Sequence, residues 1–152
     1  MMAPGGFEHG RVALRIGSLL DQHVRKNSLG SVCGAETGFI ISRDPDTVRA
    51  PDVAFVSAPT LATIEDPTGY LEVAPSLVVE VVSPNDRFSD VEEKARMWLR
   101  SGVQMVLVVD PRTRVVHAYR NPQSCQLLGG GDVLDAGDVV PGWKVAVGEF
   151  FA

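Results

Sequence analysis

Asp52, Glu80 and Lys94 are the residues of this sequence whose types and positions best fit a chemical role. Glu80 interrupts the otherwise apolar run from Leu77 to Val82, which is typical of a strand covered by protein on both faces. An ionised carboxylate in such a strand is costly unless it is paired or holds a cation. Asp52 begins a β-rich segment upstream, and Lys94 lies on a predicted helix downstream. Two acids and a lysine that meet at one sheet edge suggest metal-assisted phosphodiester chemistry.

Each of these three residues also has a purely structural interpretation. Glu80 could be a buried acid paired with one arginine, and Asp52 could simply open a turn or a strand. Lys94 could form an exposed i, i+4 pair with Asp90, worth roughly a few tenths of a kcal/mol. On a helical wheel, however, Lys94 lies at the margin of the apolar stripe, from which its ammonium can reach the sheet rim near Glu80.

Three further residues carry weaker signals. Glu36 lies on a predicted strand and could add a carboxylate to a cation site, although a surface position on an edge strand also accounts for it. His9 could contact a phosphate or an acid, but a histidine at a helix start is more often merely exposed. Asp86 is expected to cap or precede the second helix, where the helix dipole favours an acid.

The elements that must position these residues follow from hydrophobic periodicity. A helix and a long strand are predicted first, then a short strand and an irregular segment with at most one helical turn. A strand, a helix and a parallel strand follow, and short antiparallel strands end the chain. The predicted ranges are helices at 9–26 and 89–100, strands at 31–42, 53–56, 77–82, 105–109 and 115–120, and short strands around Leu127, Val139 and Val145. The pattern predicts one α/β domain over residues 1–152.

Composition limits the function classes. The net charge of −5 and pI of about 5.1 oppose broad nucleic-acid binding, which depends on Lys and Arg. A nuclease would therefore need divalent cations or a local basic patch. No apolar run approaches the roughly 20 residues of a membrane helix, and no signal peptide is visible. Cys33 and Cys125 match no metal-ligand spacing, so reduced cysteines and a cytoplasmic location are expected.

The order and spacing of these motifs resemble the Uma2 family of bacterial putative restriction endonucleases, within the PD-(D/E)XK nuclease superfamily. The resemblance covers nearly the whole chain. It is carried by Glu8-His9-Gly10, by residues 49–56, 75–86 and 102–111, and by Asp90 with Lys94. It implies a restriction-endonuclease-like mixed sheet with an α-β-β-β-α-β core, to which the predicted C-terminal antiparallel strands are added.

The resemblance also implies that Asp52 and Glu80 are metal ligands. The superfamily's lysine normally lies two residues after the acid, where this sequence has Val82. The family resembled here supplies the lysine from the following helix, which makes Lys94 the replacement. The family usually has a further strand before the first helix, and because this sequence starts almost at the helix, that edge strand is expected to be missing.

The leading hypothesis is an endonuclease that needs Mg²⁺ or Mn²⁺ and hydrolyses DNA phosphodiesters. Asp52, Glu80 and the main-chain carbonyl near Val81 would hold the cation, and Glu36 would complete the coordination. Lys94 would orient the attacking water or stabilise the developing charge. A homodimer is expected, since many such nucleases cut two strands with paired sites. The competing hypothesis is a catalytically degenerate nuclease fold that serves as a binding or assembly module.

Overall fold

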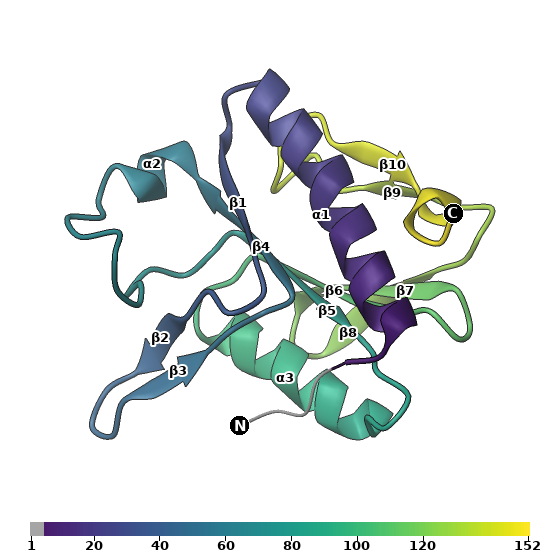
Figure 1. Ribbon diagram of the computed structural model, residues 1–152, viewed down its shortest axis with the longest axis horizontal. Coiled ribbons are helices and arrows are strands. Elements are labelled where there is room, and N and C mark those ends of the chain that lie inside the picture. Colours follow the sequence, from purple (N-terminus) through teal and green to yellow (C-terminus); the bar gives the residue numbers. More distant parts are fainter. Residues whose placement is uncertain (1–4) are drawn as a thin grey trace.

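A six-stranded mixed sheet lies at the centre of the computed structural model, which describes residues 5–152 (Figure 1). One neighbouring pair, β5 with β6, is parallel, and the other four pairs are antiparallel. From one edge to the other, its strands are β1 (Gly30–Gly34), β4 (Val53–Ser57), β5 (Leu77–Val81), β6 (Met105–Asp110), β7 (Val115–Asn121) and β8 (Ser124–Leu128).

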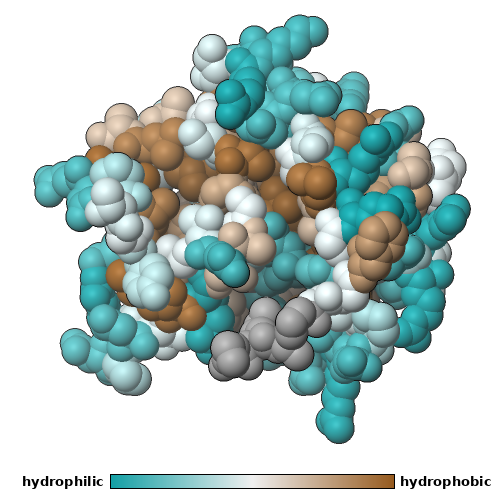
Figure 2. Space-filling view, viewed as in Figure 1, coloured by the Kyte–Doolittle hydropathy of each residue, from teal (hydrophilic) through white to brown (hydrophobic). Residues whose placement is uncertain are grey.

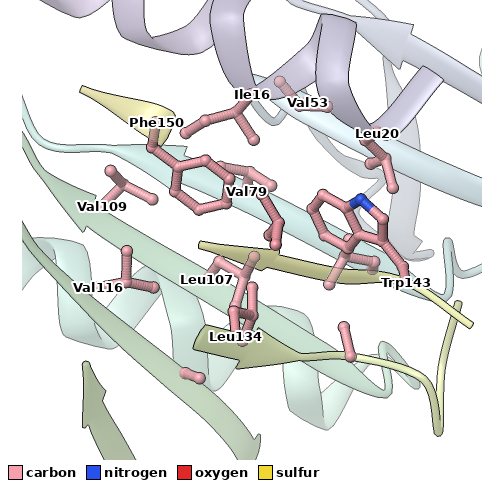
Figure 3. Packing of buried hydrophobic residues seen from close by; sticks show 14 of the residues in the cluster. Ile16, Leu20, Val53, Val79, Leu107, Val109, Val116, Leu134, Trp143 and Phe150 are labelled. Carbon is pink, nitrogen blue, oxygen red and sulfur yellow. The ribbon is translucent and has the colours of Figure 1, made fainter. Parts of the chain in front are cut away.

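The helix α1 (Phe7–Lys26) and the C-terminal segment cover one face of this sheet. Val12, Ile16, Leu20 and Val24 form the buried stripe of α1 at a spacing of four residues. The C-terminal segment contains β9 (Val133–Asp135), β10 (Lys144–Ala146) and the 3-10 helix η1 (Val147–Phe150). Figure 3 shows Trp143 and Phe150 from this segment packed together with residues of α1 over the sheet; their ring centroids are 6.4 Å apart.

The helix α3 (Phe88–Arg100) covers the opposite face through Val91, Ala95 and Trp98. This helix connects the parallel strands β5 and β6, as the sequence predicts. Trp98 also contacts Phe39, edge to face, with their ring centroids 6.2 Å apart. Phe39 begins the small hairpin of β2 (Phe39–Ser42) and β3 (Thr47–Arg49), which projects from the sheet (Figure 1).

The strand β5 is buried along its whole length, and its alternation separates the two cores. Leu77, Val79 and Val81 belong to the core under α1, whereas Val78 packs in the core under α3. Glu80 is therefore expected to point towards α3, and its carboxylate does lie against Trp98 of that helix. An acidic side chain thus occupies a position where packing alone would favour valine.

Most predicted elements are confirmed to within two residues, including the single helical turn α2 (Ala58–Leu61). The single strand predicted at 31–42 is wrong: it is broken between β1 and β2, where Glu36 has a left-handed backbone with φ 73°. The break moves the chain from the main sheet into the β2–β3 hairpin. The sequence does not predict β3, because a strand of three residues shows too little hydrophobic periodicity.

The strand predicted around Val139 is also wrong. The N–H of Val139 donates to the carbonyl of Ala136 at 3.0 Å, which closes a turn instead. Its side chain is half-buried and packs against the core under α1. An apolar side chain that docks from a turn gives the same local signal as one from a short strand. Among the described residues, no helix is long and apolar enough to cross a membrane.

Candidate active site

A cleft of about 1020 Å³ runs between α1 and the edge of the sheet. Its walls come from α1 as far as Asp21, from β1 and the turn after it, from the start of β4, the end of β5 and the first half of α3. Asp52, Glu80 and Lys94 all line it. The structure therefore brings together, in one concavity, three residues that are separated in sequence by up to 42 positions.

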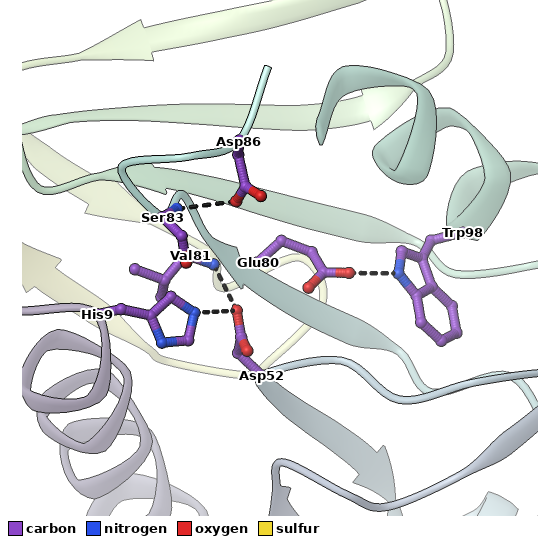
Figure 4. Close-up of polar contacts among 7 residues, drawn as sticks. All are labelled: His9, Asp52, Glu80, Val81, Ser83, Asp86 and Trp98. Carbon is purple, nitrogen blue, oxygen red and sulfur yellow. Dashed lines mark hydrogen bonds and ion pairs between the residues drawn. The ribbon is translucent and has the colours of Figure 1, made fainter. Parts of the chain in front are cut away.

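Asp52 lies immediately before β4, and its carboxylate is tightly held. The antiparallel register pairs Val53 with Val79, so continuing it by one residue brings Asp52 beside Glu80. The backbone N–H of Val81 donates to Asp52 Oδ2 at 2.8 Å, and His9 Nε2 lies 3.2 Å from the same oxygen (Figure 4). Only 18% of the Asp52 side chain is exposed.

Glu80 is the one charged residue that is buried in the described part of the chain, with 8% of it exposed. The indole N–H of Trp98 donates to Glu80 Oε2 at 3.0 Å, and Figure 4 shows the carboxylate directed towards that ring. Its hydrogen-bond partner is thus a neutral donor from α3 rather than the arginine of the structural interpretation. Burial, followed by the negative charge of Asp52, raises the pKa of Glu80 to about 7.

Lys94 lies on α3, one helical turn before Trp98, and is half-buried at the wall of the cleft. Its positive charge acts on Glu80 and opposes the rise in the pKa of that carboxyl. The position at the margin of the apolar stripe therefore allows the ammonium to act on the buried acid, as the helical wheel predicts.

Glu36 lines the same cleft, but it is exposed and lies in the turn after β1 instead of on a strand. Within residues 5–152, no three His, Cys, Asp or Glu side chains form a group that could hold a metal ion. Glu36 is therefore not assembled with Asp52 and Glu80 into such a group. Its role as a ligand stays a prediction.

Asp86 precedes α3 without capping it, since the N-cap residue is Arg87. The Asp86 carboxylate accepts a hydrogen bond from the N–H of Ser83 at 2.8 Å, and the N–H of Asp86 donates to the carbonyl of Ser83. These two bonds fix the turn that follows β5 at the rim of the cleft.

Of the residues of the site, Trp98 is not identified by the sequence reasoning, and His9 is identified only through one of two alternatives. The alternative in which His9 contacts an acid is confirmed: its Nε2 lies 3.2 Å from Asp52 Oδ2, and only 19% of its side chain is exposed. The hydrogen bond with Asp52 raises the pKa of His9, against the opposing effect of burial. Trp98 was assigned only to the apolar stripe, but its indole is the donor to Glu80. The sequence signal for His9 is its place in the Glu8-His9-Gly10 motif. For Trp98, the sequence indicates only a position on the apolar stripe of the helix and gives no sign of the hydrogen bond to Glu80.

The donor chemistry of the cleft fits a hard divalent cation. Asp52 and Glu80 are neighbouring carboxylates whose mutual repulsion contributes to the raised pKa of Glu80, and a cation between them would relieve it. Oxygen donors suit Mg²⁺ and Mn²⁺, and Mg²⁺ usually keeps several water ligands, so two carboxylates suffice.

Comparisons with known proteins identify the fold and the family of the chain. No protein of curated function matches the chain in sequence. A crystal structure of a putative nuclease of the DUF820 group from Anabaena variabilis superposes with a TM-score of 0.84 and 18% sequence identity. The alignment covers 99% of this chain and 83% of the Anabaena chain, so the two proteins share a fold. A family model described as Uma2, putative restriction endonuclease, matches residues 1–148. The chain therefore belongs to the Uma2 family of putative restriction endonucleases.

Proposed function

We propose that this protein is a divalent-metal-dependent endonuclease that hydrolyses DNA phosphodiester bonds. Membership of a family of putative restriction endonucleases supports a nuclease. The observation that carries the proposal is the placement of Asp52, Glu80 and Lys94 on one cleft, with the pKa of Glu80 raised by burial and by Asp52. Pairs of acids whose environments perturb their pKa values are concentrated at functional sites.

Each residue of the site would have a distinct role in this reaction. Asp52, Glu80 and the carbonyl near Val81 would hold Mg²⁺ or Mn²⁺, with Glu36 as a further oxygen ligand. The bound cation would polarise the scissile phosphate and acidify a water. Lys94 would stabilise the negative charge that develops on the phosphoryl oxygens or orient the water, since it lines the cleft and its positive charge acts on Glu80.

Cleavage of plasmid and single-stranded DNA by purified protein tests this proposal. With Mg²⁺ or Mn²⁺ we expect cleavage that EDTA abolishes, and Asp52→Asn, Glu80→Gln and Lys94→Met should each reduce the rate by about a hundredfold or more. Cleavage that persists in both acid variants would show that the proposed site is not the catalytic one.

Two exposed residues outside the cleft provide matched controls for these variants. Asp138 pairs with Arg120, and Lys144 lies near Asp135 at 3.9 Å. Asp138→Asn and Lys144→Met make the same chemical changes away from the cleft, so both variants should keep the wild-type cleavage rate.

The second candidate is a nuclease fold that serves for binding or assembly without catalysis. It is favoured by the lack of a three-ligand group in the described residues and by the net charge of −5. Calorimetric titration with Mn²⁺ separates the two candidates, because a degenerate site should bind no divalent ion near Asp52. A homodimer, which sedimentation would detect, would suit an enzyme that cuts both strands of a duplex with paired sites.

A further inference from the structure

Two hydrogen bonds converge on one oxygen of the Asp52 carboxylate. The Val81 N–H and His9 Nε2 converge on Oδ2 at 2.8 Å and 3.2 Å (Figure 4). An ionised carboxylate can only accept hydrogen bonds, so Nε2 of His9 must carry the proton that it donates. Two donors on one oxygen fix the carboxylate plane and leave Oδ1 outside both bonds.

The two donors come from different elements of the fold. Val81 lies on β5, the strand next to β4, so its N–H belongs to the sheet itself. His9 lies in the first turn of α1, and its hydrogen bond with Asp52 spans 43 residues of sequence. Because the next turns of α1 are anchored by the fully buried Val12 and Ile16, the position of His9 is set by the helix and not by a flexible loop.

The backbone before α1 also confines the His9 ring. A Cβ atom built on Gly5 would lie 2.7 Å from Nδ1 of His9 and 2.9 Å from Cγ. A side chain at position 5 would therefore clash with the imidazole and would have to shift either the ring or the backbone before α1. The ring is thus held between the Gly5 backbone on one side and the Asp52 carboxylate on the other.

We propose that His9 is a positioning residue that orients the carboxylate of Asp52 for cation binding through Oδ1. This inference rests on the proposed metal-dependent function. It assigns to the N-terminal helix a direct part in building the site, beyond covering the sheet. A histidine that holds a ligating carboxylate in one orientation raises metal affinity, and loss of such a partner typically costs 10- to 100-fold in affinity or activity.

Two substitutions at position 9 separate hydrogen bonding from packing. His9→Leu keeps much of the side-chain volume but removes the donor, whereas the side-chain amide of His9→Gln can replace the Nε2–H. By Mn²⁺ calorimetry we expect His9→Leu to bind about 10- to 100-fold more weakly than wild type, and His9→Gln to stay within about threefold. In cleavage assays, His9→Leu should need more metal for half-maximal rate, with a near-normal rate at saturating metal.

His23 provides a matched control on the same helix. Its Nε2 lies 2.8 Å from the carbonyl oxygen of Pro141, away from the cleft residues. His23→Leu therefore removes a comparable hydrogen bond of α1, and Mn²⁺ affinity should remain that of wild type. Thermal melts of all variants in EDTA show whether a loss of affinity reflects unfolding.

Gly5→Ala is a second variant that leaves His9 itself unchanged. Since its methyl group would crowd the imidazole, we expect it to weaken Mn²⁺ binding in the same direction as His9→Leu. Gly5→Ala therefore tests the positioning role of His9 even if His9→Leu fails to fold.

Wild-type Mn²⁺ affinity in His9→Leu or Gly5→Ala would overturn the positioning role while leaving the proposed nuclease intact. Equal weakening in His9→Gln and His9→Leu, with unchanged melting temperatures, would show that the hydrogen bond is not what matters. A wild-type protein that binds no Mn²⁺ would instead refute the proposed function, and the role of His9 with it.

Discussion

At the scale of single residues, Glu80 is the group whose environment departs most from what its chemistry prefers. Its carboxyl is buried in the sheet beside the acid Asp52, and the indole of Trp98, the charge of Lys94 and the backbone of Asp52 offset this only in part. Burial and the charge of Asp52 raise its pKa from 4.5 to about 7. Folding without a cation therefore favours the protonated form of this side chain.

The stability of the metal-free protein should accordingly depend on pH through Glu80. Between pH 4.5 and about 7 the folded state binds more protons at this site than the unfolded state, so the Glu80 contribution to stability falls as pH rises. The loss is on the order of a few kcal/mol. Glu80→Gln, which stays neutral, should raise the melting temperature in EDTA at pH 8 and change it little at pH 5.

Differential scanning fluorimetry at both pH values measures this effect. Glu65→Gln is the control, because Glu65 is exposed and its neutralisation should change neither melting temperature appreciably. A Glu80→Gln protein that melts below wild type at pH 8 would contradict the assignment of Glu80 as an unfavourably buried acid. Cation binding would then not be needed to explain why the wild-type protein keeps an acid at position 80.

At the scale of elements, the connection between α1 and β1 determines where the N-terminal helix lies on the sheet. Gly30 begins β1 with φ +149°, and a Cβ at this position would overlap the carbonyl oxygen of Val56 on β4. The adjacent N–H of Ala58 donates to the carbonyl of Leu29 at 2.9 Å. Only glycine permits this close approach, so the placement of α1, and with it the reach of His9 to Asp52, depends on it.

Gly30→Ala should therefore destabilise the protein by about 2 kcal/mol or more, because both the backbone angle and the space are unsuitable for a side chain. Gly34 at the other end of β1 is the matched control: nothing lies within 4 Å of a Cβ there. Gly34→Ala should change stability by only about 0.5 kcal/mol. Urea unfolding of the two variants tests this, and equal stabilities would show that the α1–β1 connection can readjust.

At the scale of the whole molecule, negative charge governs how a nucleic acid can approach. The net charge is −5, and Figure 2 shows hydrophilic side chains around the periphery of the face drawn, with apolar ones gathered near its middle. The charged side chains that line the cleft are mainly acidic: Asp21, Glu36, Asp52, Glu80 and Asp86, with Lys94 and His9 as the basic ones. Phosphates brought into this cleft would be repelled unless cations intervene.

DNA binding, and not only cleavage, should therefore require a divalent cation. Fluorescence anisotropy of a short labelled DNA should show affinity at least roughly tenfold higher in Ca²⁺ than in EDTA with Na⁺ at equal ionic strength. Ca²⁺ serves here as a carboxylate-binding ion that allows binding to be measured apart from cleavage. Equal affinity in the two solutions would place the DNA-binding surface away from the acidic cleft.

The sequence alone determined the elements with strong periodicity and the acid within them. The spacing of Val12, Ile16, Leu20 and Val24 predicts α1, and the apolar run around Glu80 predicts β5. The connection through α3 predicts the parallel pair, and the motifs resemble the family that the family model also matches. These signals are local, because hydrophobic side chains repeat with the geometry of the element that buries them.

Only the tertiary structure decided which polar groups meet. The hydrogen bond between His9 and Asp52 joins residues 43 positions apart, and that between Trp98 and Glu80 joins residues 18 positions apart. Neither follows from the spacing of residues along the chain, since each depends on how a helix packs across a sheet. The backbone break at Glu36 likewise arises where the chain leaves one sheet for another, which no local propensity records. Sequence therefore determined the carboxylates and the elements that bear them, and packing determined the partners that orient those carboxylates.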